Sequence, residues 1–192
     1  MATQTPRPTT PRLAPTGEDD WDDDTRVLLD RLDRANIFTT LAHHPDLLRR
    51  WLRFGSHVLI QSTVPPRERE LVILRVGWRC TAEYEFGQHR VLGGVVGLTD
   101  DEIVAVTADA PSAADGWSES DLELLQAADE LVDDFCLTDA TWAALTARWS
   151  TQQVLDLIFT VGQYTLVSMA LNSLGVQLDD GLTGFPTAEE AS

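Results

Sequence analysis

The chain contains few cysteines and few basic residues, and each shortage excludes a class of protein. Only Cys80 and Cys136 occur among 192 residues, too few for a small domain held together by disulfides. The 14 basic residues are outnumbered by 31 acidic ones, which gives a formal net charge of -17. Because this charge repels phosphate backbones and anionic lipids, neither nucleic acid nor a membrane is an expected partner. The same charge slows the approach of an anionic substrate, unless arginines such as Arg75 and Arg79 reverse it near a pocket.

An uninterrupted apolar run of membrane-spanning length is also absent. The longest apolar tract, residues 154–171, is interrupted by Asp156 and by the pair Gly162 and Gln163. This pattern predicts a buried helix and no membrane span. The N-terminus lacks a basic stretch followed by an apolar one, so we expect a reduced protein in the cytoplasm.

Sustained two-residue alternation of apolar and polar residues is missing as well, which argues against β-strands. The sequence therefore predicts an all-α fold of about seven or eight helices. At 192 residues with 43% hydrophobic residues, the chain can bury one ordinary core. We expect a single helical domain over residues 25–180 and a tail over residues 181–192. Residues 1–24 are rich in Pro and Thr and then acidic, and we expect them to be flexible unless docked.

Local signals indicate where the helices begin and end. Apolar residues recur at helical spacing from Leu47 to Leu59, and Pro65 and Pro66 precede a helix over residues 67–78. Residues 71–76 are apolar on nearly every side, which places this helix in the middle of the bundle. The next helix spans about residues 82–96 and stops at a glycine. Later starts and the last stop are marked by capping boxes at Thr99, Ser118 and Ser150, a cap at Thr138 or Asp139, and Gly175.

The stretch "RCTAEYEFGQH", residues 79–89, carries the densest set of reactive side chains. Glu85 and His89 are four residues apart, which places a carboxylate and an imidazole on one face of a helix. By spacing alone, a solvated surface pair remains the commoner explanation of such residues. Glu83 lies four residues after Arg79, a spacing typical of a surface ion pair. The sequence contains neither HExxH nor CxxC, so we expect no metal site.

A longer pattern around this stretch resembles a known family. The runs "NIFTTLAHHPDLLRRWLRFGSHVL", "PPRERELVILRVGWRCTAEYEFGQHRVLGGVVGLTDDEI" and "VGQYTLVSMALNSLGV" are similar to the carboxymuconolactone decarboxylase family, which includes alkylhydroperoxidase-like proteins. The resemblance covers about residues 36–178 and is most specific over residues 67–103. It implies an alkylhydroperoxidase-like helical bundle that uses no cofactor and assembles as a homotrimer or homohexamer.

The resemblance also implies which residues form the site. In the peroxidase branch, a Glu is followed by CxxCxxxH, and the two cysteines cycle between dithiol and disulfide. Matching that Glu and His to Glu70 and His89 places the two cysteine positions at Ala82 and Glu85. Without both thiols the disulfide cycle cannot close within this motif. The arrangement therefore resembles the decarboxylase type, with Cys80 outside the motif.

The resemblance implies a lyase that acts on a small organic acid or lactone through an enolate. Glu70, Glu85 and His89 are the expected catalytic residues, and Arg75, Tyr84 and Cys80 are expected near the substrate. Arg75 or His89 could hold the developing oxyanion, and either Glu could supply a proton. Tyr164 could add a hydroxyl, although an aromatic in a helical core more often serves packing.

Two other functions stay open at this point. One is a peroxide- or thiol-linked oxidoreductase that uses Cys80 as a lone nucleophile, and the other is an oligomeric binding protein without catalysis. Both thiols are expected to be small buried residues of the core.

Overall fold

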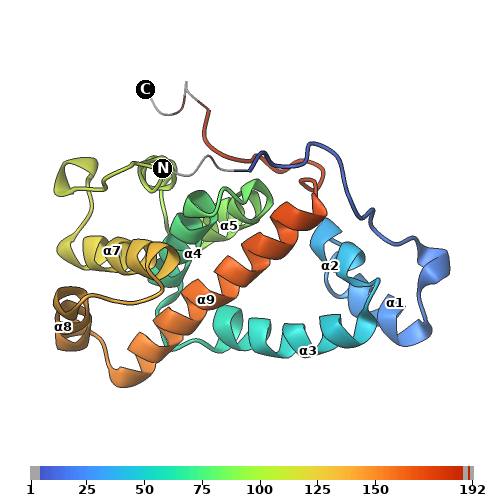
Figure 1. Cartoon of the computed structure of the whole chain (residues 1–192), viewed down its shortest axis with the longest axis horizontal. Coiled ribbons are helices and arrows are strands. Elements are labelled where there is room, and N and C mark those ends of the chain that lie inside the picture. The colour runs from blue at the N-terminus through green and yellow to red at the C-terminus, as the bar shows by residue number, and fades with distance from the viewer. Residues whose placement is uncertain (1–4, 188–189, 191–192) are drawn as a thin grey trace.

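The computed structural model describes residues 5–187 and residue 190, and within this part of the chain all regular structure is helical (Figure 1). The α-helices are α1 Asp23–Asp30, α2 Asn36–Leu41, α3 Pro45–Ser56, α4 Pro66–Arg79, α5 Glu83–Val95, α6 Asp100–Ala105, α7 Glu119–Asp133, α8 Asp139–Arg148 and α9 Thr151–Leu174. Two short 3-10 segments, η1 Glu18–Asp20 and η3 Ala113–Asp115, and a π-helical turn, η2 His57–Gln61, complete them. The all-α prediction is confirmed. Short elements such as α2, with six residues, leave little periodic signal and explain the extra helices.

The predicted caps are present. Thr99, Ser118 and Ser150 each form a capping box at the start of α6, α7 and α9. Thr138 caps α8, and Gly175 ends α9 in the left-handed conformation with a φ of 68°. These caps satisfy backbone groups that the helix ends leave without partners, so local sequence alone defines most helix boundaries.

Helix α4 lies at the centre, as predicted, and packs against α5, α7 and α9. Every residue from Arg69 to Gly77 is buried. One core cluster joins α4 to α7 and α9 through residues such as Val72 and Leu157, and a second joins it to α5 and α7 through Leu71 and Phe86. A helix that is apolar all round can be buried on every side, which is the physical reason for this position.

The turn between α4 and α5 determines which residues meet. It consists of Cys80, Thr81 and Ala82, and Thr81 has a φ of 52°. This short connection brings the two helices back past each other, so the N-terminal part of α4 lies beside the C-terminal part of α5. Residues that are 19 positions apart in sequence can therefore become neighbours.

The N-terminal segment is docked onto the helices, although little of it is regular. The backbone N–H groups of Arg12 and Leu13 donate to the Leu174 carbonyl at 2.9 and 3.2 Å, and the Thr16 N–H donates to the Thr39 carbonyl at 3.1 Å. Figure 1 shows this segment running along the end of α9 toward α1. The sequence predicted that this segment is flexible unless it docks, and residues 5–22 are docked. Residues 1–4 lie outside the described part of the chain.

The C-terminal tail also lies on the helices. The Phe185 ring packs edge-on against Trp78 and Phe86, with centroids 5.1 and 5.2 Å away. The tail passes so close to α5 that a Cβ at Gly87 would lie 2.8 Å from the Thr183 carbonyl oxygen. A glycine at this position therefore allows the tail to close over α5.

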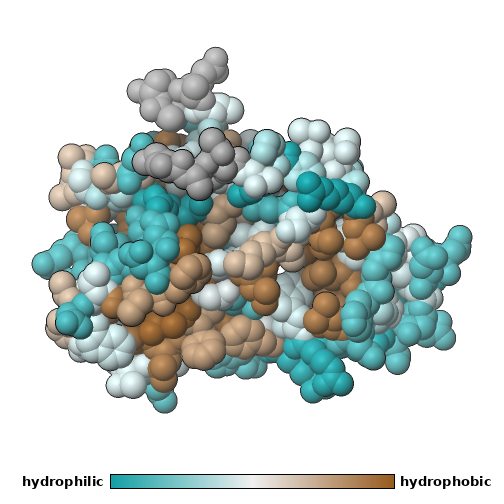
Figure 2. Space-filling view, in the orientation of Figure 1, coloured by the Kyte–Doolittle hydropathy of each residue, from teal (hydrophilic) through white to brown (hydrophobic). Residues whose placement is uncertain are grey.

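Helix α9 has one buried and one exposed apolar face. By length and composition it is the one helix in the described residues that could cross a membrane, and half of its most apolar stretch is buried within the chain. The exposed face carries Leu155, Phe159, Leu166 and Met169. Figure 2 shows apolar surface over α9, on the same face of the molecule as the apolar residues beside α3.

Candidate functional site

A pocket of about 230 Å³ lies between α2, α3, α5 and α9. In Figure 1, α9 crosses the front of the molecule and α3 runs below it, with α5 behind. Most of the pocket wall is apolar. The apolar side chains on it are Leu32, Ala35, Ile37, Phe38, Trp51, Leu52, Leu59, Ile60, Leu92, Val167 and Leu171. The polar side chains on the wall are Ser56, Tyr84, Glu85, Gln88, His89, Gln163 and Tyr164. A small apolar pocket with a few converging polar groups is typical of a binding or catalytic site.

His89 is held by a carboxylate behind it. Its Nδ1 atom lies 2.6 Å from Oε2 of Glu70, and both residues are buried. The prediction that Glu70 approaches His89 is therefore confirmed. Arg69 donates from Nε to the other oxygen, Oε1 of Glu70, at 3.3 Å. A carboxylate accepts this bond, so the hydrogen sits on Nδ1 and the Nε2 lone pair of His89 is left free to act as a base.

Glu85 is the second carboxyl group of the site, in a different environment. It is fully buried, its Oε2 accepts a hydrogen bond from the Ser168 hydroxyl at 3.2 Å, and its Oε1 has no partner among the described residues. Burial raises the pKa of Glu85 well above its ordinary value, with only the Ser168 bond acting against the rise. Glu85 thus favours its protonated form, in which it donates a hydrogen.

Glu85 and His89 share one wall of the pocket, as their spacing predicts, but they are not a hydrogen-bonded pair. His89 bonds to Glu70, and Glu85 bonds to Ser168. The site therefore has two carboxyl groups with separate partners, one bonded to the imidazole and one whose pKa is raised by burial. Two titratable groups with opposed environments are the usual basis of an acid and base assignment.

Tyr164 and Gln163 of α9 close the pocket opposite α5. The Tyr164 ring meets the His89 ring edge-on, with centroids 4.7 Å apart. Burial, followed by the nearby carboxyl groups of Glu70 and Glu85, raises the pKa of the Tyr164 hydroxyl well above its ordinary value. The amide oxygen of Gln163 is buried without a partner among the described residues. An unpaired acceptor on a pocket wall is available to a ligand.

Three residues of this arrangement were missed by sequence reasoning: Arg69, Gln163 and Ser168. Gln163 carried a signal, because an amide in the middle of a long apolar helix needs a hydrogen-bonding partner or a pocket. Arg69 and Ser168 carried none, since an arginine beside a glutamate and a serine in a helix are both ordinary.

Arg75 does not lie at this pocket. Its guanidinium is completely buried and donates to both carboxylate oxygens of Asp129 and to the carbonyls of Val106 and Ala108, all at 2.7 Å. Arg79 likewise pairs with Asp129 and with Asp133, and not with Glu83 as the sequence predicted. These four hydrogen bonds join α4 to α7 and to the loop after α6. Because Arg75 does not line the pocket, it is not placed to hold a substrate oxyanion there.

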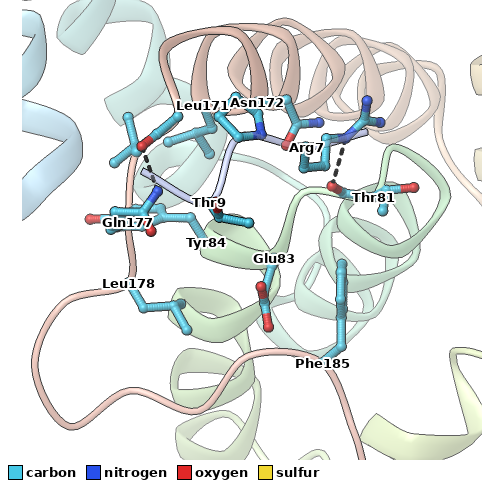
Figure 3. Close-up of a pocket in the computed structure, with 13 residues that line it drawn as sticks. Arg7, Thr9, Thr81, Glu83, Tyr84, Leu171, Asn172, Gln177, Leu178 and Phe185 are labelled. Carbon is cyan, nitrogen blue, oxygen red and sulfur yellow. Dashed lines mark hydrogen bonds between the residues drawn. The ribbon is translucent and has the colours of Figure 1, made fainter. Parts of the chain in front are cut away.

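Tyr84 stands between this pocket and a second cavity of about 540 Å³ (Figure 3). Its hydroxyl donates to Asp179 at 2.6 Å and accepts from the Ile37 N–H at 3.2 Å. In the second cavity, the Arg7 guanidinium donates to the carbonyls of Thr5, Cys80 and Thr81. Polar groups of this cavity are thus occupied by the chain itself, and none of Glu70, Glu85 or His89 lines it.

The two cysteines lie on separate elements and are both free. Cys80 follows α4 and is half-buried, and burial, then the charge of Glu85, raises the pKa of its thiol. It does not line the pocket that contains His89. Cys136 is exposed after the end of α7, so the prediction that it serves the core was wrong. Short polar turns expose residues of any type, and the helix ends before this cysteine.

No set of three or more His, Cys, Asp or Glu side chains in residues 5–187 or at 190 is placed to hold a metal ion.

Comparisons with known proteins agree with this fold. The alkylhydroperoxidase AhpD core protein from Ralstonia eutropha JMP134, described as an uncharacterized peroxidase-related protein, superposes with a TM-score of 0.77 at 18% identity, over 88% of this chain and 93% of that one. A peroxidase-related protein from Silicibacter sp. TM1040 gives a TM-score of 0.74 at 11% identity, over 96% and 97% of the two chains. A variant of the debrominase Bmp8 in complex with 2,3,4-tribromopyrrole gives 0.72 at 12% identity, over 90% and 94%.

The fold is thus similar to that of alkylhydroperoxidase-like helical proteins. Residues 45–130, a little under half of the chain, match the model of the carboxymuconolactone decarboxylase family. The match includes Glu70, Glu85 and His89. The resemblance seen in the sequence is therefore confirmed. No curated protein matches the sequence significantly.

The neutral state of Glu85 predicts a pH-dependent difference in stability. Because its folded pKa is raised above the ordinary 4.5, the unfolded chain releases this proton at lower pH than the folded chain does. The contribution of protonated Glu85 to the free energy of unfolding is fully present below the ordinary pKa of 4.5. It is lost as the pH rises from there toward the folded pKa. We expect Glu85→Gln, which keeps the shape without the charge, to gain stability relative to the wild type over this window, by up to about 1.4 kcal/mol per pH unit.

Urea unfolding from about pH 4 to about pH 9 measures this difference, and Glu83→Gln is the matched control. Glu83 is exposed two residues earlier on the same helix, so its removal is expected to leave the pH dependence of stability nearly unchanged. Parallel pH profiles for the wild type and Glu85→Gln would contradict the neutral state of Glu85.

Proposed function

We propose that this protein is a cofactor-independent acid–base enzyme that acts on a small organic acid or lactone through an enolate. The observation that carries the proposal is the 2.6 Å hydrogen bond between Glu70 and His89 beside a pocket that Glu85 also lines. A carboxylate behind an imidazole fixes its tautomer and stabilises the imidazolium that forms when the base takes a proton. Decarboxylation, isomerisation and lactone opening are the reactions of this type that the family suggests.

The proposed step moves one proton and one electron pair. His89 Nε2 takes a proton from the carbon next to a carbonyl group, and the electrons of the C–H bond form the C=C bond of an enolate. Glu85, in its neutral form, donates a hydrogen bond to the enolate oxygen and keeps its proton. Return of the proton from His89 to the same or to another carbon completes an exchange or an isomerisation. In a decarboxylation, the electrons of the C–CO₂ bond form the enolate as CO₂ leaves, the enolate carbon takes a proton from neutral Glu85, and the resulting carboxylate regains a proton from water.

The alternative function is thiol-linked peroxide reduction, and its support is the similarity of the fold to peroxidase-related proteins. It has less support here, because Ala82 and Glu85 occupy the redox-cysteine positions of that branch and Cys80 has no second thiol three residues on. The raised pKa of Cys80 also lowers its thiolate fraction.

Hydrogen–deuterium exchange tests the proposal with simple carbonyl compounds as probes. Small lactones and cyclic ketones are incubated with the wild-type protein in D₂O, and loss of the α-proton signal is followed by ¹H NMR. We expect at least one probe to exchange about 10²-fold faster than in buffer of the same pH. Binding of probes without any acceleration would instead favour a non-catalytic binding protein.

A further inference from the structure

The pocket contains no cation that could pair with a substrate anion. All 14 basic residues of the chain are arginines, and none of them lines this pocket. Arg69 donates to Glu70, and Arg75 and Arg79 pair with acidic residues of α7. Arg7 belongs to the second cavity. A carboxylate that entered the pocket would therefore lose its hydration without gaining an ion pair.

His89 does not supply the missing charge. Its imidazole bonds to Glu70, and in the proposed function the ring that receives the substrate is the neutral base, which carries no charge for a substrate anion. The Glu85 carboxyl experiences the environment that a ligand carboxyl would meet, because it lies on the pocket wall and has no basic partner. Burial favours its uncharged form. The same physical effect applies to a carboxyl group on a ligand.

The wall does contain polar atoms for an uncharged ligand. The Gln163 amide oxygen and Glu85 Oε1 are both buried without partners among the described residues. The first accepts a hydrogen bond, and a protonated Glu85 donates one. Around them the wall is aliphatic and aromatic, and the exposed rim includes Ile60 and Leu92. This combination suits a compact apolar molecule with a carbonyl oxygen and a single donor.

We propose that the pocket takes an uncharged carbonyl compound, such as a lactone or cyclic ketone, and excludes the corresponding carboxylate. This inference rests on the proposed acid–base function and narrows its substrate class. A substrate without a carboxylate cannot lose CO₂, so the reaction becomes proton transfer: His89 removes an α-proton, the enolate oxygen accepts a hydrogen bond from Glu85, and His89 returns the proton to carbon. The volume of about 230 Å³ limits the substrate to a small molecule.

Two probes of the same shape test the charge preference directly. They are 5-oxotetrahydrofuran-2-carboxamide, which is neutral, and 5-oxotetrahydrofuran-2-carboxylate, which is its anion-bearing isostere. Dissociation constants are measured at about pH 8 by ligand-observed NMR with the full chain. We expect the carboxamide to bind at least about tenfold more tightly than the carboxylate. Equal affinity, tighter binding of the carboxylate, or no binding of either probe at millimolar concentration would overturn the inference.

A cation placed at the rim should reverse the preference. Ile60 is 75% exposed and lines the pocket, so Ile60→Arg adds a guanidinium at the entrance without disturbing the core. We expect it to tighten carboxylate binding by about fivefold or more. Val95→Arg is the matched control, because Val95 is 79% exposed on α5 and does not line the pocket. A similar gain in both variants would indicate only the change in net charge and would contradict a charge-selective pocket.

The same probes separate this inference from the proposed function. Exchange of the α-protons of the carboxylate probe, at a rate equal to or above that of the carboxamide, would retain acid–base catalysis and overturn the charge preference. Tight binding of the carboxamide without any exchange would retain the preference and overturn catalysis.

Discussion

Replacing His89 by alanine is expected to slow the α-proton exchange of the responsive probe by about 10²- to 10⁴-fold, the usual contribution of a positioned general base. His89 lines the pocket, and Glu70 holds its ring by the 2.6 Å bond to Nδ1, which leaves Nε2 as the proposed base. Removal of the ring leaves no other imidazole on the wall. Exchange rates from ¹H NMR at matched protein concentration measure the effect.

Glu70→Gln tests the role of Glu70 in positioning His89. The amide can donate a hydrogen to Nδ1, which moves the ring hydrogen to Nε2 and removes the base while the geometry is kept. We expect a loss comparable to that of His89→Ala, and a double variant that is no slower than the worse single one, because the two residues act as a unit.

His57→Ala is the matched control for these variants. His57 also pairs with a carboxylate, Asp156 at 3.1 Å, but its side chain is 47% exposed and it does not line the pocket. Exchange in this variant should equal that of the wild type. If His57→Ala slowed exchange as much as His89→Ala does, or if His89→Ala retained the wild-type rate, the assignment of His89 as the base would be wrong.

Arg75→Met is expected to destabilise the protein by about 3 to 5 kcal/mol, the cost of breaking a buried ion pair by removing one partner. The substitution keeps the apolar stem and leaves the Asp129 carboxylate and the carbonyls of Val106 and Ala108 without their main donor. Urea unfolding measures the loss. Since Arg75 is remote from the pocket, the folded variant should still exchange α-protons at the wild-type rate.

Arg148→Met is the control for this second prediction. Arg148 pairs with Glu119 and Glu123, but its side chain is 43% exposed, and surface ion pairs contribute less than about 1 kcal/mol. A loss below about 1 kcal/mol for Arg75→Met, or a folded variant that no longer catalyses exchange, would indicate that Arg75 has a different role from the one its contacts assign.

The outcomes for Arg75 and Cys136 explain where sequence reasoning stops. An arginine within an apolar helix could hold a substrate or an internal carboxylate, and only the position of Asp129, 54 residues away, distinguishes the two. The exposure of Cys136 depends on where α7 ends, and cysteine has no capping signal to mark that end. In both cases the deciding partner or boundary is not local in sequence.

By itself, the sequence determined the helical class, the central position of α4 and the capped helix ends, whereas the approach of Glu70 to His89 was expected from the family resemblance. These features depend on residue spacing and on caps, which act over a few positions. Tertiary structure alone decided that Glu85 bonds to Ser168, that Gln163 closes the pocket and that no arginine faces it. Burial and charge balance depend on residues that come together from four helices, and the periodicity of one helix does not contain that information.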